Sequence, residues 1–103
     1  MMESDRQFTS GNWVVKEQSE DLFVERWTEF TQWAKKSARG AGTFLLMRDD
    51  SNPRHFVSLG SWKDVESVNN WSSSEEFVER LTRCRELCEE FKPSDYGLAA
   101  RVA

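Results

Sequence analysis

This sequence has few histidines and cysteines, and it has no excess of basic residues. Its 103 residues include one histidine and two cysteines, and 18 acidic against 14 basic residues give a formal net charge of −4. Because binding to phosphates needs a basic stripe, this balance disfavours nucleic acid as a partner. It is the composition that we expect of a cytoplasmic protein.

Long apolar runs and the motifs of common enzyme classes are also missing. No run approaches the roughly 18 residues that a membrane span needs, so we expect no membrane partner. The sequence has no Gly-rich phosphate loop, nucleophile elbow or zinc motif. Cys84 and Cys88 lie four apart in a helical pattern with no histidine nearby. That spacing rarely suits a disulfide, and two thiols are too few for structural zinc, so we expect no metal site.

Aromatic residues are what the sequence has in abundance. It contains seven Phe, five Trp and one Tyr. In a small domain this many rings either fill the core or line an apolar pocket.

Periodicity and capping signals predict a single domain at 11–103 behind a flexible N-terminal tail at 1–10. Ser19 is a candidate N-cap for the first long helix. Ser72 and Ser73 each precede a glutamate by three residues, which predicts a capping box for the second. The expected elements are a strand at 13–17, a helix at 20–39, strands at 43–49 and 55–62, a short helix at 64–68, a helix through the apolar stripe of Phe77, Leu81, Cys84, Cys88 and Phe91 that Pro93 stops, and a strand at 96–102.

This β-α-β-β-α-β order predicts an α+β, ferredoxin-like protomer with a four-stranded antiparallel sheet. Right-handed crossovers place both helices on one face of the sheet. The other face would then expose apolar side chains of the second and third strands: Leu45, Met47, Val57 and Leu59. Since so large a patch is rarely left bare, we expect a homodimer that packs sheet against sheet.

The stretch from His55 to Phe77 carries a family resemblance. Phe56-Val57, then Trp62-Lys63-Asp64, a short helix, and Ser74 with Phe77 resemble the antibiotic-biosynthesis-monooxygenase-like proteins. The resemblance covers about residues 11–102. It implies a dimeric α+β barrel with a cavity between sheet and helices.

The resemblance also implies a function. Several members oxidise polycyclic aromatic or quinol-type substrates with O₂ and without metal or flavin. We therefore expect a monooxygenase-like protein that binds a small aromatic molecule in an apolar pocket and needs no cofactor. A non-catalytic ligand-binding or stress-related dimer on the same scaffold is the alternative, which leaves open whether the chain is an enzyme.

Haem degradation is a further alternative within this resemblance. Haem-degrading relatives use an Asn, a Trp and a His. Trp71 looks like their tryptophan, and Gly11 or Asn12 stands near their asparagine. Their histidine would align with Leu81, which cannot ligate iron.

Asn12, Trp71 and His55 are the candidate catalytic residues. Asn12 could donate to a substrate oxygen, and Trp71 could stack on a planar substrate. His55 is the one side chain whose ordinary pKa lies near neutrality, so it is a candidate general base. The expected substrate-binding residues are Trp13, Phe44, Trp62 and Trp71.

Overall fold

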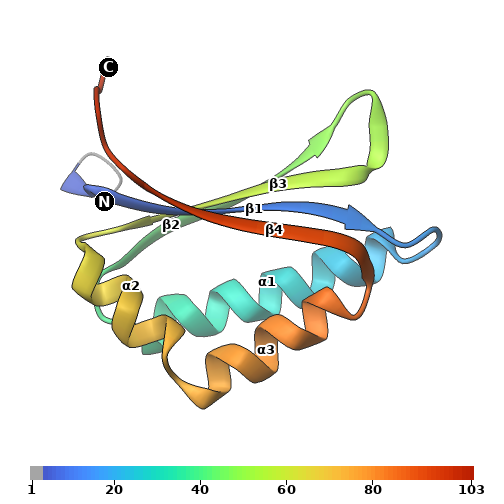
Figure 1. Ribbon diagram of the computed structural model, residues 1–103, viewed down its shortest axis with the longest axis horizontal. Coiled ribbons are helices and arrows are strands. Elements are labelled where there is room, and N and C mark those ends of the chain that lie inside the picture. Colours follow the sequence, from blue (N-terminus) through green and yellow to red (C-terminus); the bar gives the residue numbers. More distant parts are fainter. Residues whose placement is uncertain (1–3) are drawn as a thin grey trace.

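A computed structural model describes residues 4–103 and shows one sheet with every helix on the same side (Figure 1). The elements follow the order β1 (Gln7–Val15), α1 (Glu20–Ser37), β2 (Ala41–Asp49), β3 (Asn52–Trp62), α2 (Val65–Ser72), α3 (Glu75–Arg85) and β4 (Cys88–Gly97). The strands lie in the order β2-β3-β1-β4, and all three pairings are antiparallel. The ferredoxin-like α+β fold is therefore confirmed, with α2 as a complete short helix.

The core lies between the inner face of the sheet and the helices. Alternation along β1 turns Trp13 and Val15 inward, where they are 2% and 0% exposed. Helix α1 presents Phe23, Trp27 and Phe30 to them at helical spacing. Burying one such side chain contributes roughly 1.5–3 kcal/mol, so this aromatic layer stabilises the fold.

The first strand begins earlier than the sequence predicts. Residues 7–10, expected in a flexible tail, pair with both β3 and β4. Polar residues hid this strand, because only alternate positions of a sheet with one open face need to be apolar. Residues 1–3 lie outside the described part of the chain.

The helix and strand predicted for the last third of the chain have the wrong bounds. Helix α3 ends at Arg85, and Cys88 and Phe91, expected on that helix, lie in β4. Pro93 lies within this strand opposite Gly11 rather than ending a helix. A proline is tolerated there because β4 is at the sheet edge, where one side of the backbone has no partner strand. The strand expected at 96–102 therefore runs from Cys88 to Gly97 instead.

The capping box predicted at Ser72 and Ser73 is wrong. The N-cap is Ser74, whose hydroxyl accepts a hydrogen bond from the Phe77 amide at 3.2 Å. Ser72 is the last residue of α2, and Ser73 is the C-cap of that helix. Asp64 is the N-cap of α2, and its carboxylate accepts a hydrogen bond from the Ser67 amide at 2.9 Å. Ser19 stands at the N-cap of α1 but makes no side-chain capping bond.

The outer face of the sheet has no helix over it (Figure 1). Leu45 and Met47 on this face are 42% and 46% exposed, and Tyr96 of β4 is 55% exposed. Val57 and Leu59 of β3 are half-buried beside them. No helix within residues 4–103 is long and apolar enough to cross a membrane.

Candidate functional site

A cavity of about 290 Å³ lies between the inner face of the sheet and the helices. Its size is at the lower end of small-molecule pockets, which span roughly 300–1,000 Å³. Seven aromatic residues line it: Trp13 and Phe44 from the sheet, Trp27 and Phe30 from α1, Trp71 from α2, Phe77 from α3 and Phe91 from β4. The cavity is therefore suited to a planar apolar molecule.

Trp71 is the centre of this aromatic wall. Its ring lies 4.6 Å from that of Trp62 and 4.5 Å from that of Phe77, centroid to centroid. Phe30 stacks on it at 5.6 Å. The indole nitrogen Nε1 of Trp71 is shielded from solvent and has no hydrogen-bond partner among the described residues. A buried donor without a partner costs about 1–3 kcal/mol.

The other expected pocket residues differ in their access to the cavity. Trp13 lines it with its ring stacked on Phe91 at 4.0 Å, and its indole N–H donates to Ser58 Oγ at 3.0 Å. Phe44 lines it as well. Trp62 does not: it is fully buried behind Trp71, and its N–H donates to Thr9 Oγ1 at 3.1 Å. Trp62 thus supports the wall from behind.

Sequence reasoning missed the polar groups on the cavity wall. Asp95 of β4 is the only carboxylate that lines it among the described residues. It pairs in register with Thr9, so it shares the inner face with Trp13 and Phe91. Its position was missed because the sequence placed this segment between a helix and a strand. The Ser58 hydroxyl accepts from Trp13 and keeps its own hydrogen to donate.

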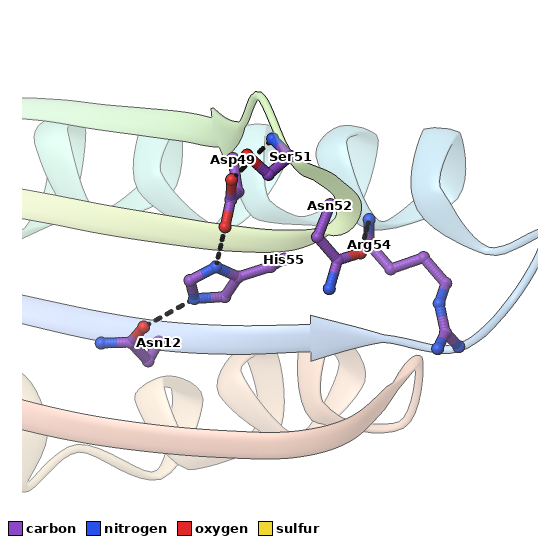
Figure 2. A network of polar contacts seen from close by, with 6 residues as sticks. All are labelled: Asn12, Asp49, Ser51, Asn52, Arg54 and His55. Carbon is purple, nitrogen blue, oxygen red and sulfur yellow. Dashed lines mark hydrogen bonds and ion pairs between the residues drawn. The ribbon is translucent and has the colours of Figure 1, made fainter.

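Asn12 and His55 are brought together, but on the outer face of the sheet (Figure 2). Their register partners are Val57 and Val14, which alternate with the inward-facing pair Trp13 and Phe56. The sheet therefore separates both side chains from Trp71 and the cavity. His55, the only histidine of the chain, cannot ligate the iron of a haem in the cavity.

The imidazole of His55 lies between two oxygen acceptors (Figure 2). Its Nδ1 is 2.9 Å from Asp49 Oδ2, and its Nε2 is 2.8 Å from Asn12 Oδ1. Both ring nitrogens are therefore engaged by neighbouring side chains. The hydrogen bond from His55, followed by that from the Ser51 amide, lowers the pKa of Asp49 below its ordinary value. The hydrogen bond between His55 and Asp49 links β3 to the end of β2 beside the β2–β3 hairpin turn.

The part of the chain described by the structure has no cluster of three or more His, Cys, Asp or Glu side chains that could hold a metal ion. The two cysteines are free thiols. Burial raises the pKa of Cys84 to about 12 and that of Cys88 to about 11. Both thiols therefore remain protonated at neutral pH and are poor nucleophiles.

Comparison with known proteins places this geometry in a family. A sequence model described as antibiotic biosynthesis monooxygenase matches residues 11–81. Among curated proteins, none matches the sequence significantly.

Solved structures share the whole fold. SnoaB of Streptomyces nogalater, a cofactor-independent oxygenase, is 15% identical over 96% of each chain, with a TM-score of 0.82. A conserved protein from Methanosarcina mazei Go1 is 18% identical over 93% of this chain and 95% of that one, with a TM-score of 0.80. At such identities the likeness establishes the fold.

Proposed function

The chain belongs to the antibiotic biosynthesis monooxygenase family, and from that premise we propose that it is a cofactor-independent monooxygenase that acts on a small aromatic or quinol-type molecule in the cavity beneath the sheet. The observation that carries this proposal is the unpartnered indole N–H of Trp71 within an aromatic wall. The structural likeness to SnoaB, a cofactor-independent oxygenase, agrees with it.

The aromatic wall binds the substrate and keeps water away from it. Trp13, Phe44 and Phe91 offer ring faces from the sheet, and Phe30 and Phe77 offer them from the helices. A planar substrate loses little conformational entropy on binding there. Removal of water strengthens each polar interaction that remains.

The chemistry that we propose begins with deprotonation of the substrate. Asp95 accepts the proton of a phenolic or activated carbon acid, directly or through one water. The resulting anion places its charge on an oxygen, to which the Trp71 N–H donates a hydrogen bond. Donation to this charge is stronger than donation to the neutral substrate, so the contact favours the reacting form.

Oxygen then reacts with the anion, and the substrate supplies all the electrons. A ring methylene loses both hydrogens and becomes a carbonyl. One atom of O₂ enters that carbonyl, and the other leaves as water. In this proposal Asn12 and His55 take no part in the chemistry, because they lie on the opposite face of the sheet.

Oxygen uptake with a panel of hydroquinones and anthrones tests the proposal. We expect protein-dependent uptake that falls about 10²-fold in Trp71→Phe, the scale of one lost donor to a developing anion. Trp71→Phe keeps an aromatic ring and loses only the N–H, whereas Trp71→Ala loses both and should also weaken binding. Uptake in Trp71→Phe equal to wild type would refute the role of the N–H, and absence of uptake on every substrate would favour a non-catalytic binding protein.

We also propose that two copies associate through the outer faces of their sheets. The apolar residues on this face, led by Leu45, Met47 and Tyr96, have no covering element within the described chain. A polar margin that includes His55 and Asn12 borders them, as in protein interfaces with an apolar centre.

The two free thiols fit a reducing compartment, and we propose that the protein is cytoplasmic.

A further inference from the structure

A second hollow, of about 500 Å³, lies outside the aromatic cavity between the end of α1 and helix α2. Trp71 lines both hollows, so they are adjacent and share its ring as a wall. We call the outer hollow the polar groove. Its other lining residues are Trp33, Ser37, Ala38, Arg39, Lys63, Asp64, Glu66, Ser67, Asn70, Ser74 and Glu76.

Helical spacing explains why these side chains gather in one place. Trp33 and Ser37 are four apart on α1, so they lie on the same face of that helix. Ser67, Trp71 and Ser74 recur at four and three residues along α2 and its end. Gly40, with φ +87°, turns the chain sharply after α1, and its carbonyl accepts a hydrogen bond from the Lys63 amide at 2.9 Å. That bond holds the two walls of the groove together.

The chemistry of the polar groove differs from that of the cavity. Its lining combines two basic residues with three acidic ones, so charges of both signs are present: Arg39, Lys63, Asp64, Glu66 and Glu76. Asp64 is already engaged: it accepts hydrogen bonds from the amide and hydroxyl of Ser67 at 2.9 and 2.7 Å. Glu76 pairs with Arg80 at 2.8 Å.

Four groove residues remain available to a ligand. Arg39, Lys63, Glu66 and Asn70 have no side-chain hydrogen bond or ion pair with any residue in the described chain, 4–103. Together they offer both donors and acceptors, which suits groups that donate and accept at once. Hydroxyl groups have this property, whereas a carboxylate only accepts. The rings of Trp33 and Trp71 add apolar surface for the carbon skeleton that bears such hydroxyls.

We propose that the polar groove is a subsite for a neutral, multiply hydroxylated substituent, such as a glycosyl group, on the aromatic substrate. This inference rests on the proposed function, because the aromatic part of the same ligand occupies the cavity on the other side of Trp71. Substrates would then be aromatic glycosides or polyol-bearing aromatics. The groove would select among aromatics that the cavity alone accepts equally.

A matched pair of ligands tests the subsite. Emodin and its O-glucoside differ only by the sugar, and their dissociation constants can be measured by quenching of tryptophan fluorescence. We expect the glucoside to bind about tenfold more tightly to the wild type, the scale of one or two added hydrogen bonds. Asn70→Ala and Lys63→Ala should abolish this difference and leave emodin binding unchanged.

Matched control variants are available on the same chain. Asn69 immediately precedes Asn70 on α2 but does not line the groove, and Lys92 is an exposed lysine of β4. Asn69→Ala and Lys92→Ala should keep the preference for the glucoside. Equal affinity for the two ligands in the wild type, or equal weakening of both by the groove variants, would overturn the subsite.

The outcomes separate the subsite from the proposed function. If emodin binds and the glucoside gains nothing, the subsite is wrong and the proposed function stands. If neither ligand binds, the aromatic cavity does not take this class of molecule and both fall. Tighter binding of rhein, which carries a carboxylate, that Lys63→Ala removes would also overturn the proposal, because it would assign the groove to anions.

Discussion

Trp71, on α2, and His55, on β3, lie on opposite sides of the sheet, and their hydrogen-bonding surroundings differ. Trp71 has a buried N–H without an acceptor, whereas both ring nitrogens of His55 face oxygens of Asp49 and Asn12. The Trp71 donor is unsatisfied, whereas both nitrogens of the His55 ring are engaged. In the sequence, Asn12, His55 and Trp71 are candidates because of their residue type alone. Which side of the sheet each one occupies depends on strand register and on the placement of the helices.

Asp49 gives a pH-dependent test at the scale of one residue. Its pKa is lowered below 3.8, chiefly by the hydrogen bond from His55. A depressed carboxyl pKa contributes stability above the unfolded value, and this is lost as pH falls through the lower folded value. We expect Asp49→Asn to lower the free energy of unfolding in urea at pH 7 and to lie closer to the wild type at pH 3.

Asp50→Asn is the matched control, since Asp50 is exposed and outside the network. It should leave the unfolding curve unchanged at both pH values. A difference between Asp49→Asn and wild type that persists undiminished at pH 3 would show that the hydrogen bond between Asp49 and His55 is not its source.

At the scale of elements, the sequence predicts the middle of the fold, from α1 to α2, better than the first strand and the end of the chain. The apolar periodicity of α1 and the capping residue Asp64 before α2 are local signals, and both helices are confirmed. Cys88 and Phe91 misled because they lie three apart, as on a helix. A bulge explains this spacing: β4 shifts register where Val15 pairs with Cys88 and Val14 with Glu90, which turns both Cys88 and Phe91 inward.

The cavity could be predicted only in part for the same reason. Trp13, Phe44 and Trp71 follow from aromatic content and strand alternation, and all three line it. Asp95 could not be found, because its inward direction depends on the pairing of β4 with β1. Pairings between segments far apart in sequence leave no local pattern to read.

Ser74 and Ser73 give a test of which serine caps α3. Ser74 Oγ accepts from the Phe77 amide and donates to the Trp71 carbonyl at 2.9 Å. Ser74→Ala should lower the free energy of unfolding by about 1 kcal/mol, the usual effect of losing an N-cap. Ser73→Ala should change it by less than about half of that in the same urea titration. Equal losses in the two variants would contradict this assignment of the cap.

At the scale of the whole molecule, the two faces of the sheet serve different ends. The helices close the inner face over a cavity, and the outer face remains open (Figure 1). Association through the outer face would leave the cavity of each copy intact. Light scattering at micromolar concentration should therefore give twice the 12.0 kDa mass of the chain.

Met47→Lys tests this association, because a charge would be buried at the centre of the interface. It should yield a folded 12.0 kDa monomer. Val78→Lys is the control: Val78 is 56% exposed, comparable to 46% for Met47, but it lies on α3 and should leave the dimer intact. A monomeric wild type, or a Met47→Lys variant that stays dimeric, would contradict the proposed interface.

The central claim is that an aromatic ligand enters the cavity and accepts a hydrogen bond from Trp71. The most direct test is the nitrogen–proton NMR spectrum of the five indole N–H groups during titration with emodin. We predict that the Trp71 signal, assigned by its loss in Trp71→Phe, moves downfield and exchanges more slowly with water, while those of Trp13 and Trp62 keep their hydrogen-bonded shifts. An unmoved Trp71 signal at saturating emodin would contradict the account.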